Sequence, residues 1–148
     1  MISVISRVHP AISGCSLAFW LLLGGLDIVS LWRTWRPSEE ARWAFWGLCT
    51  AILVTFLSGY VADGFLYPPD DGAVSGRIAD HHSWGRWAVF ILPIVAGARL
   101  VAKRRGDFIS AIGYAISLSC LGAILLYVGY LGGSLVFDDG VGVMTRRG

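Results

Sequence analysis

A run of thirty residues, from Phe108 to Phe137, contains no Asp, Glu, Lys, Arg or His. An α-helix rises about 1.5 Å per residue, so about 20 apolar residues are enough to cross the hydrocarbon core of a bilayer. Three further apolar runs precede this one: residues 11–32, which contain Asp27, residues 43–62, and the shorter segment 87–98. These four runs predict a protein that lies in a lipid bilayer.

Composition agrees with this interpretation. Hydrophobic residues make up 55% of the 148 residues and charged residues 15%, whereas about a quarter of the residues in a soluble domain are charged. Four spans of about 20 residues leave little chain for a domain outside the membrane. We therefore predict an all-α fold, a four-helix transmembrane bundle that forms one domain over residues 1–148. The predicted helices cover residues 10–33, 40–66, 83–102 and 107–134.

Basic residues predict the side of the membrane that each loop faces. Seven lie in the first and third loops: Arg33, Arg36, Arg42, Arg99, Lys103, Arg104 and Arg105. Five lie on the other side: Arg7, Arg77, Arg86, Arg146 and Arg147. Because cytoplasmic loops are enriched in Lys and Arg, both termini are expected on the periplasmic, outer side of a bacterial inner membrane. A net charge of +2 that is spread over helix ends does not suggest nucleic acid as a partner.

The third predicted helix is the least regular. Twelve residues separate Arg86 from Arg99, which is about 18 Å of helix, and Pro93 lies in the middle. The two arginine side chains can extend to opposite interfaces and so recover a spanning length. A re-entrant segment is the alternative. Residues 68–80, which begin with two prolines, are predicted to form the only sizeable loop.

All three histidines map to one predicted face of the membrane. His9 precedes the first predicted helix, whereas His81 and His82 precede the third. Haem b proteins in helical bundles hold the iron between imidazoles from facing helices, so His9 with His82, or with His81, could bind a haem. Alternatively, the histidines cap helices, or His81 and His82 form a zinc or copper site with Asp80.

Asp27 is the only ionisable residue well inside an apolar run. An acid within a membrane span is a functional candidate because burying a carboxylate is unfavourable. Asp27 could serve proton or small-solute transport, or it could pair with an arginine near the inner interface. Asp63, at the outer end of the second predicted helix, could join the histidine face.

Several short motifs resemble those of a bacterial membrane-protein family known as domain of unknown function 2231. They are His9-Pro10, Asp27, Ser58-Gly59-Tyr60, a histidine before the third helix, and Gly132-Gly133-Ser134-Leu135-Val136 followed by Gly140-Val141-Gly142-Val143. The resemblance covers nearly the whole chain, and its terminal motif is the most specific part. It implies four helices and, because some members carry Rieske or c-type cytochrome modules, an electron-transfer setting at the outer face.

Two positions differ from the pattern of that family. Gly14 stands where members often have a second histidine, and Phe137-Asp138-Asp139-Gly140 replaces a common Tyr-x-His-Gly. A cofactor that depends on those histidines in relatives would be bound differently in this chain or would not be bound.

The leading functional hypothesis is a haem-b-type electron-transfer or membrane-anchor subunit of a redox complex. Its partners would be membrane or periplasmic redox subunits. A cofactor-free accessory subunit of a larger membrane complex is the first alternative, and a transporter that uses Asp27 is the second. The sequence contains no catalytic triad, phosphate-binding loop or nucleotide fingerprint, so a stand-alone enzyme is not expected.

Overall fold

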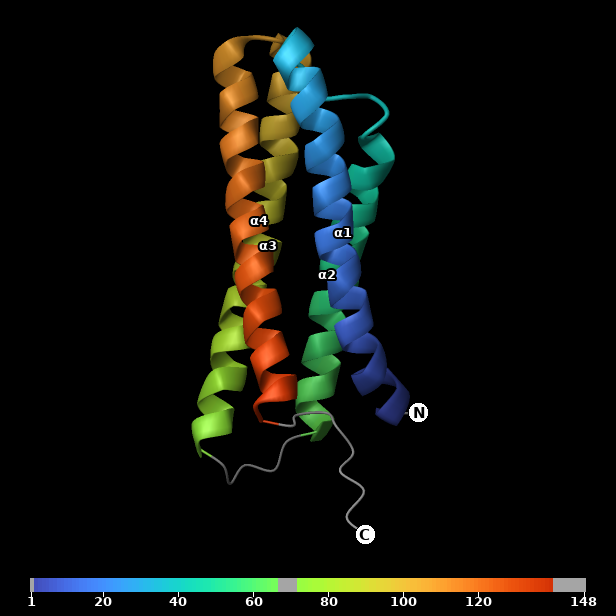
Figure 1. Ribbon diagram of the computed structural model, residues 1–148, viewed down its shortest axis with the longest axis vertical. Helices are drawn as coiled ribbons and strands as arrows, with labels where there is room; N and C mark the ends of the chain where they lie inside the picture. Colours follow the sequence, from blue (N-terminus) through green and yellow to red (C-terminus); the bar gives the residue numbers. More distant parts are fainter. Residues whose placement is uncertain (1, 67–71, 140–148) are drawn as a thin grey trace.

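The computed structural model is a bundle of four long helices (Figure 1). It describes residues 2–66 and 72–139, and the side chains of His9, residues 12–61 and residues 72–139 within them. The helices are α1 (Ile2–Thr34), α2 (Arg42–Leu66), α3 (Gly72–Arg105) and α4 (Phe108–Phe137). No strand occurs in these described ranges.

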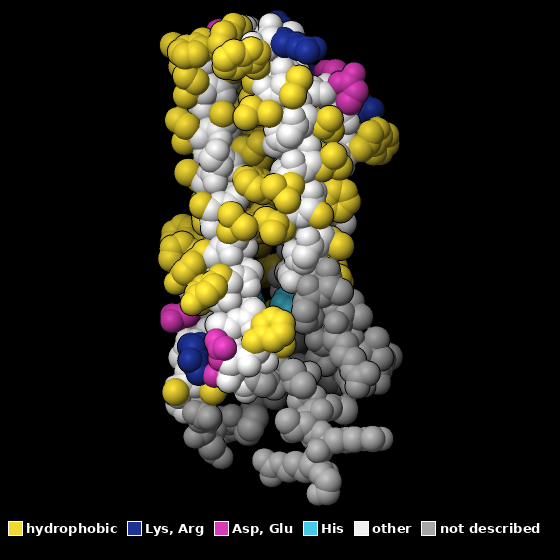
Figure 2. All heavy atoms as spheres, in the orientation of Figure 1, with side chains coloured by type: hydrophobic (Ala, Val, Ile, Leu, Met, Phe, Trp, Pro, Cys, Tyr) yellow, Lys and Arg dark blue, Asp and Glu magenta, His cyan; other side chains and the backbone are white. Residues whose placement is uncertain are grey.

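The predicted fold class is confirmed. Each of the four helices is long and apolar enough to cross a bilayer, with candidate spans at Ile12–Thr34, Arg42–Val61, Gly72–Arg105 and Phe108–Phe137. Large apolar side chains remain exposed along all four helices, and Figure 2 shows them over most of the visible face, with charged side chains near the two ends. Such an exterior suits lipid, so the chain is an integral, multi-pass membrane protein.

Two helices begin well before their predicted starts. α1 begins at Ile2 rather than at residue 10, and α3 begins at Gly72 rather than at residue 83. The loop predicted for residues 68–80 was therefore wrong over residues 72–80, while residues 68–71 lie outside the described part of the chain. The extension of α3 is held by tertiary contacts that turn signals cannot reveal, because Ile78 is buried and Arg77 pairs with Asp139, which follows α4.

α3 is one continuous helix of 34 residues, with Pro93 inside it. The re-entrant alternative is not observed. Its short apolar segment is extended at both ends by residues that are less apolar but helical, which gives the helix more than the length needed to span.

The helices form two hairpins, α1–α2 and α3–α4, that pack side by side. Between the hairpins, α1 contacts α4 and α2 contacts α3, so α1 and α3 lie on one diagonal of the bundle. Both of these helices run in the same direction, upward in Figure 1. Residues at the same height on α1 and α3 can therefore meet only in the centre of the bundle.

Apolar side chains fill the middle of the bundle, and the most deeply buried are Leu23, Leu48, Val95 and Leu121. One close contact between the hairpins is that of Trp20 of α1 with Gly122 of α4. A Cβ atom at Gly122 would overlap the indole ring, and the indole N–H donates to the carbonyl oxygen of Leu118 at 2.8 Å.

Two residues connect α3 to α4. Gly106 has a φ of 64°, a left-handed conformation that glycine adopts without strain, and this ends α3. Asp107 then caps α4, since its carboxylate accepts the backbone N–H of Ser110 at 2.9 Å. This tight turn fixes the two helices as an antiparallel pair.

Candidate functional site

Two polar layers cross the apolar bundle. The histidine layer contains His9 and His81, and the carboxylate layer contains Asp27, Arg99 and Tyr114. Asp27 follows His9 by eighteen residues on α1, and Arg99 follows His81 by eighteen residues on α3. Eighteen residues of helix extend about 27 Å, close to the roughly 30 Å thickness of the hydrocarbon core. The two layers therefore lie near opposite membrane interfaces.

In the histidine layer, imidazoles from the diagonal helices meet. The ring centroids of His9 and His81 are 6.3 Å apart, and the ring planes are at 84° to each other. His82 lies beside His81 on α3, with ring centroids 5.9 Å apart. In Figure 2 a histidine side chain is visible in a hollow between the helices in the lower half of the bundle. The structure thus brings His9 together with His81, the second of the two partners considered from the sequence.

Each of the two imidazoles lies against a glycine of the other helix in its own hairpin. A Cβ atom at Gly59 of α2 would be 2.9 Å from Cε1 of His9, and one at Gly132 of α4 would be 3.1 Å from Cε1 of His81. Contacts this short are tighter than side chains normally tolerate. The glycines at these two positions therefore make room for the rings inside the bundle.

The nitrogen atoms of the two rings differ in their partners. Nδ1 of His9 is 2.8 Å from Oγ of Ser58, which fixes the orientation of this ring. Burial lowers the pKa of His9, so its imidazole is neutral at pH 7 and keeps a lone pair for a ligand. Nδ1 of His81 is buried and has no hydrogen-bond partner among the described residues. A buried polar atom without a partner is unfavourable unless something else satisfies it.

The spacing of the rings fits a shared metal ion. Metal–imidazole bonds of about 2.0 Å place the centres of two rings on opposite sides of one ion about 6 Å apart. The observed separation of 6.3 Å is close to this value, and it also lies within the range of roughly 4.5–7 Å of an edge-to-face ring contact. Two neutral imidazoles on facing helices of a bundle are the donor set of a haem b. The spacing of His9 and His81 is therefore that of two imidazoles on opposite sides of one metal ion.

A three-residue metal site is not formed. In residues 2–66 and 72–139, no three His, Cys, Asp or Glu side chains are grouped as metal ligands. The alternative of a zinc or copper site at Asp80, His81 and His82 is therefore not supported. The side chain of Asp63, predicted to join the histidine face, lies outside the described residues.

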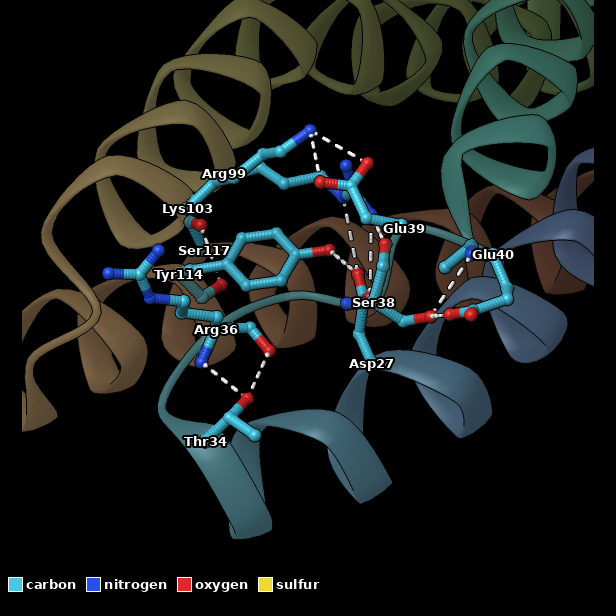
Figure 3. Close-up of polar contacts among 11 residues, drawn as sticks. Asp27, Thr34, Arg36, Ser38, Glu39, Glu40, Arg99, Lys103, Tyr114 and Ser117 are labelled. Atoms are coloured by element: carbon cyan, nitrogen blue, oxygen red, sulfur yellow. Dashed lines mark hydrogen bonds and ion pairs between the residues drawn. The ribbon is translucent and has the colours of Figure 1, made fainter.

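The carboxylate layer surrounds Asp27, which is fully buried (Figure 3). Its Oδ2 atom is 3.3 Å from Nε of Arg99 and accepts the hydroxyl of Tyr114 at 2.5 Å. Its Oδ1 atom accepts the backbone N–H of Ser38 at 2.7 Å and lies 3.4 Å from Nη2 of Arg99. Asp27 is therefore held by the α1–α2 loop, α3 and α4 together.

The guanidinium of Arg99 also has partners other than Asp27. Its Nη2 atom donates to the carbonyl oxygen of Ser38 at 2.8 Å, and its guanidinium lies 5.4 Å from the ring centroid of Phe45. The sequence predicted an arginine partner for Asp27 as one of two alternatives, and the pair is observed. It did not identify Arg99 in particular, because nothing in the chain fixes which helices share a diagonal.

Two polar residues whose side chains are buried, Tyr114 and Asp139, were not predicted from the sequence as site residues. Tyr114 lies in the uncharged run that forms α4. A buried tyrosine hydroxyl needs a hydrogen-bond partner, and this is the signal that could have identified the residue. Asp139 pairs with Arg77 of α3, and its side chain is only 7% exposed.

The chain matches no protein-family model, no curated protein and no solved structure. The function is therefore inferred from the histidine layer and the carboxylate layer.

Proposed function

We propose that this protein is a haem-binding electron-transfer or anchor subunit of a bacterial inner-membrane redox complex, with His9 and His81 as the axial ligands. The observation that carries the proposal is the 6.3 Å separation of their ring centroids in the centre of the bundle. This value agrees with two imidazoles on one iron, which are about 6 Å apart. A haem held by His9 and His81 would supply one-electron transfer.

Each residue of the histidine layer would have a distinct task. Ser58 fixes the ring of His9, because the hydrogen bond on the other ring nitrogen of a metal-binding histidine sets the orientation and tautomer of the ring. Gly59 and Gly132 keep the space for the two rings. Nδ1 of His81, which has no hydrogen-bond partner among the described residues, is the candidate for the atom of α3 that would bind the iron.

The position of the histidine layer bears on the partner. It lies near the membrane surface at which α1 and α3 begin, so a cofactor there would be close to water. The excess of basic residues in the first and third loops favours the periplasm for that surface. A periplasmic or membrane-bound redox subunit is therefore the proposed partner. The resemblance to domain of unknown function 2231 stays a prediction, and it agrees with this setting.

The proposal is tested by absorption spectroscopy of the full chain, expressed with sufficient haem and purified in mild detergent. We expect a Soret band and a reduced-minus-oxidised difference spectrum typical of a haem with two nitrogen ligands. His9→Ala and His81→Ala should each lose the spectrum. His82→Ala is the matched control on the same helix and should retain it.

A colourless wild-type protein would overturn the proposal. So would loss of the spectrum in His82→Ala with retention in His81→Ala, because the ligand on α3 would then be misassigned. Purification as a stable, colourless complex with a larger membrane assembly would favour the cofactor-free accessory subunit instead.

The contacts of Asp27 favour a structural role over transport. Both of its oxygen atoms are occupied by donors from three other segments, and Arg99 balances its charge. A carboxylate that binds and releases protons during transport needs an equilibrium between two arrangements of its partners. Unchanged proton flux in Asp27→Asn would remove the transport alternative.

A further inference from the structure

Two grooves lie side by side on the surface of α1 near its C-terminal end. The larger has a volume of about 380 Å³, and Gly25, Leu26 and Val29 form its apolar part. The smaller is bordered by Ile28, Val29 and Trp32. Both end at Arg33, which lies in the last turn of α1. Arg33 is therefore the charged group that the two apolar grooves share.

The apolar walls of these grooves face lipid. Ile28 is 68% exposed, Val29 53% and Trp32 85%. Tryptophan collects at the level of the lipid headgroups, so Trp32 marks the depth at which α1 leaves the hydrocarbon. Acyl chains that lie along Gly25 to Val29 would bring their headgroup to Arg33.

Arg33 is a cation with no carboxylate partner in the described part of the chain. Glu40, which comes from the loop before α2, lines the same larger groove. The two side chains form no ion pair with each other, since none of the described salt bridges joins them. Opposite charges thus border one groove without neutralising each other.

Glu40 is held as an anion. The hydroxyl of Ser38 donates to its Oε2 atom at 2.6 Å, which lowers the pKa of the Glu40 carboxyl. A carboxylate accepts several hydrogen bonds, so Glu40 can take a further donor. Ser30 and Thr34 also line the groove.

We propose that these grooves bind a phospholipid whose headgroup carries both a phosphate and a primary ammonium. The phosphate would pair with Arg33, the ammonium would donate to Glu40, and the acyl chains would lie on Gly25, Val29 and Ile28. A zwitterion of this kind neutralises both free charges at once. An anionic lipid satisfies only Arg33 and places its charge near Glu40, whereas a choline headgroup has no N–H to donate to Glu40.

The test is native mass spectrometry of the full chain released from mild detergent with added lipid. The probes are phosphatidylethanolamine, phosphatidylcholine and phosphatidylglycerol at equal concentrations. A charge-assisted hydrogen bond is strong enough to predict about tenfold greater retention of phosphatidylethanolamine than of phosphatidylcholine by the wild-type protein. Phosphatidylglycerol is expected to be retained less than phosphatidylethanolamine.

Three variants and one control locate the site. Arg33→Gln should reduce the retention of phosphatidylethanolamine about tenfold, because the phosphate loses its charged partner. Glu40→Gln should make the ethanolamine and choline lipids equal. Val29→Trp, which fills both grooves without changing charge, should reduce the retention of every lipid. Arg104→Gln, which removes an exposed arginine near the end of α3, should match the wild type.

Equal retention of the ethanolamine and choline lipids by the wild type would overturn the proposal. It would also be overturned if Arg104→Gln lost as much lipid as Arg33→Gln, because the effect would then be general attraction by basic residues. A lipid-free dimer that Val29→Trp dissociates would show that a second copy of the chain covers the grooves instead. Circular dichroism of each variant checks that the helices are retained.

Discussion

Asp27 and Arg99 lie on the diagonal helices α1 and α3, and their side chains meet in the centre of the bundle, with Nε 3.3 Å from Oδ2. The backbones of α1 and α3 do not pack directly on each other, so the ion pair joins the two diagonal helices through side chains, as the His9–His81 contact does in the other layer. Tyr114 and the backbone of Ser38 complete the cluster. The carboxylate layer therefore connects both hairpins.

Asp27→Asn should destabilise the bundle by about 3 kcal/mol, because removing one charge of a buried pair leaves the other uncompensated. Equilibrium unfolding in mixed micelles measures this change. Glu39→Gln is the control, since it removes an exposed ion pair with Lys103 at the same end of the bundle and should have no measurable effect. An equal loss in both variants would argue against a special role for the buried pair.

Tyr114→Phe should cost about 2 kcal/mol of stability, because it deletes a hydrogen bond to a charged group inside the protein. The same unfolding assay applies. Tyr130→Phe on α4 is the matched control, since Tyr130 is 69% exposed and should tolerate the change. If Tyr114→Phe unfolds like the wild type, the hydroxyl does not contribute to the carboxylate layer.

Gly122→Ala should destabilise the contact between the hairpins by about 1–3 kcal/mol, because the added methyl group would overlap the ring of Trp20. Gly113→Ala on the same helix is expected to have the opposite sign, with a gain of about 0.5–1 kcal/mol, since no atom lies within 4 Å of its new methyl group. Thermal unfolding of both variants compares them. Two effects of the same sign would contradict the packing argument.

Gly59→Ala tests the histidine layer without changing a proposed ligand. Its methyl group would press on the ring of His9, so we expect haem affinity to fall about tenfold, as it does when the support of a metal ligand is disturbed. Haem titration monitored at the Soret band measures this. Gly14→Ala on α1 has open space around it and should bind haem as the wild type does.

Asp107 gives a dependence of stability on pH. The backbone N–H of Ser110 lowers the pKa of the Asp107 carboxyl at the start of α4. Its stabilising effect is thus fully present above the unfolded-state pKa of about 3.9 and is lost as the pH falls through the lowered folded-state value. The difference in unfolding temperature between wild type and Asp107→Ala should shrink below about pH 4. Asp107→Asn keeps a capping oxygen but no charge, so its own capping effect should not change with pH.

Some of this architecture could be predicted from the sequence because it depends on one-dimensional signals. Uncharged runs set the number of helices, and the run that forms α4 has the same bounds in the sequence and in the structure. The position of Asp27 inside such a run indicated that it needed a partner. These predictions depend only on the composition and length of short stretches of the sequence.

Other features depend on which helices face each other. The pairing of Asp27 with Arg99 spans 72 positions, and Tyr114 reaches Asp27 from a third helix. The choice of His81 rather than His82 beside His9 depends on the rotation of α3 about its axis, which one residue changes by about 100°. The start of α3 at Gly72 likewise follows from contacts with α4.

The equal spacing of the two polar layers on α1 and α3 limits how the chain can change in length. One residue inserted between His9 and Asp27 would advance half of α1 by about 1.5 Å and turn it by about 100°. Only one of the two layers could then keep its partners from α3. An insertion or deletion between the two layers should therefore be tolerated only when α1 and α3 change by the same number of residues. Substitutions on the lipid-facing side of these helices are not limited in this way.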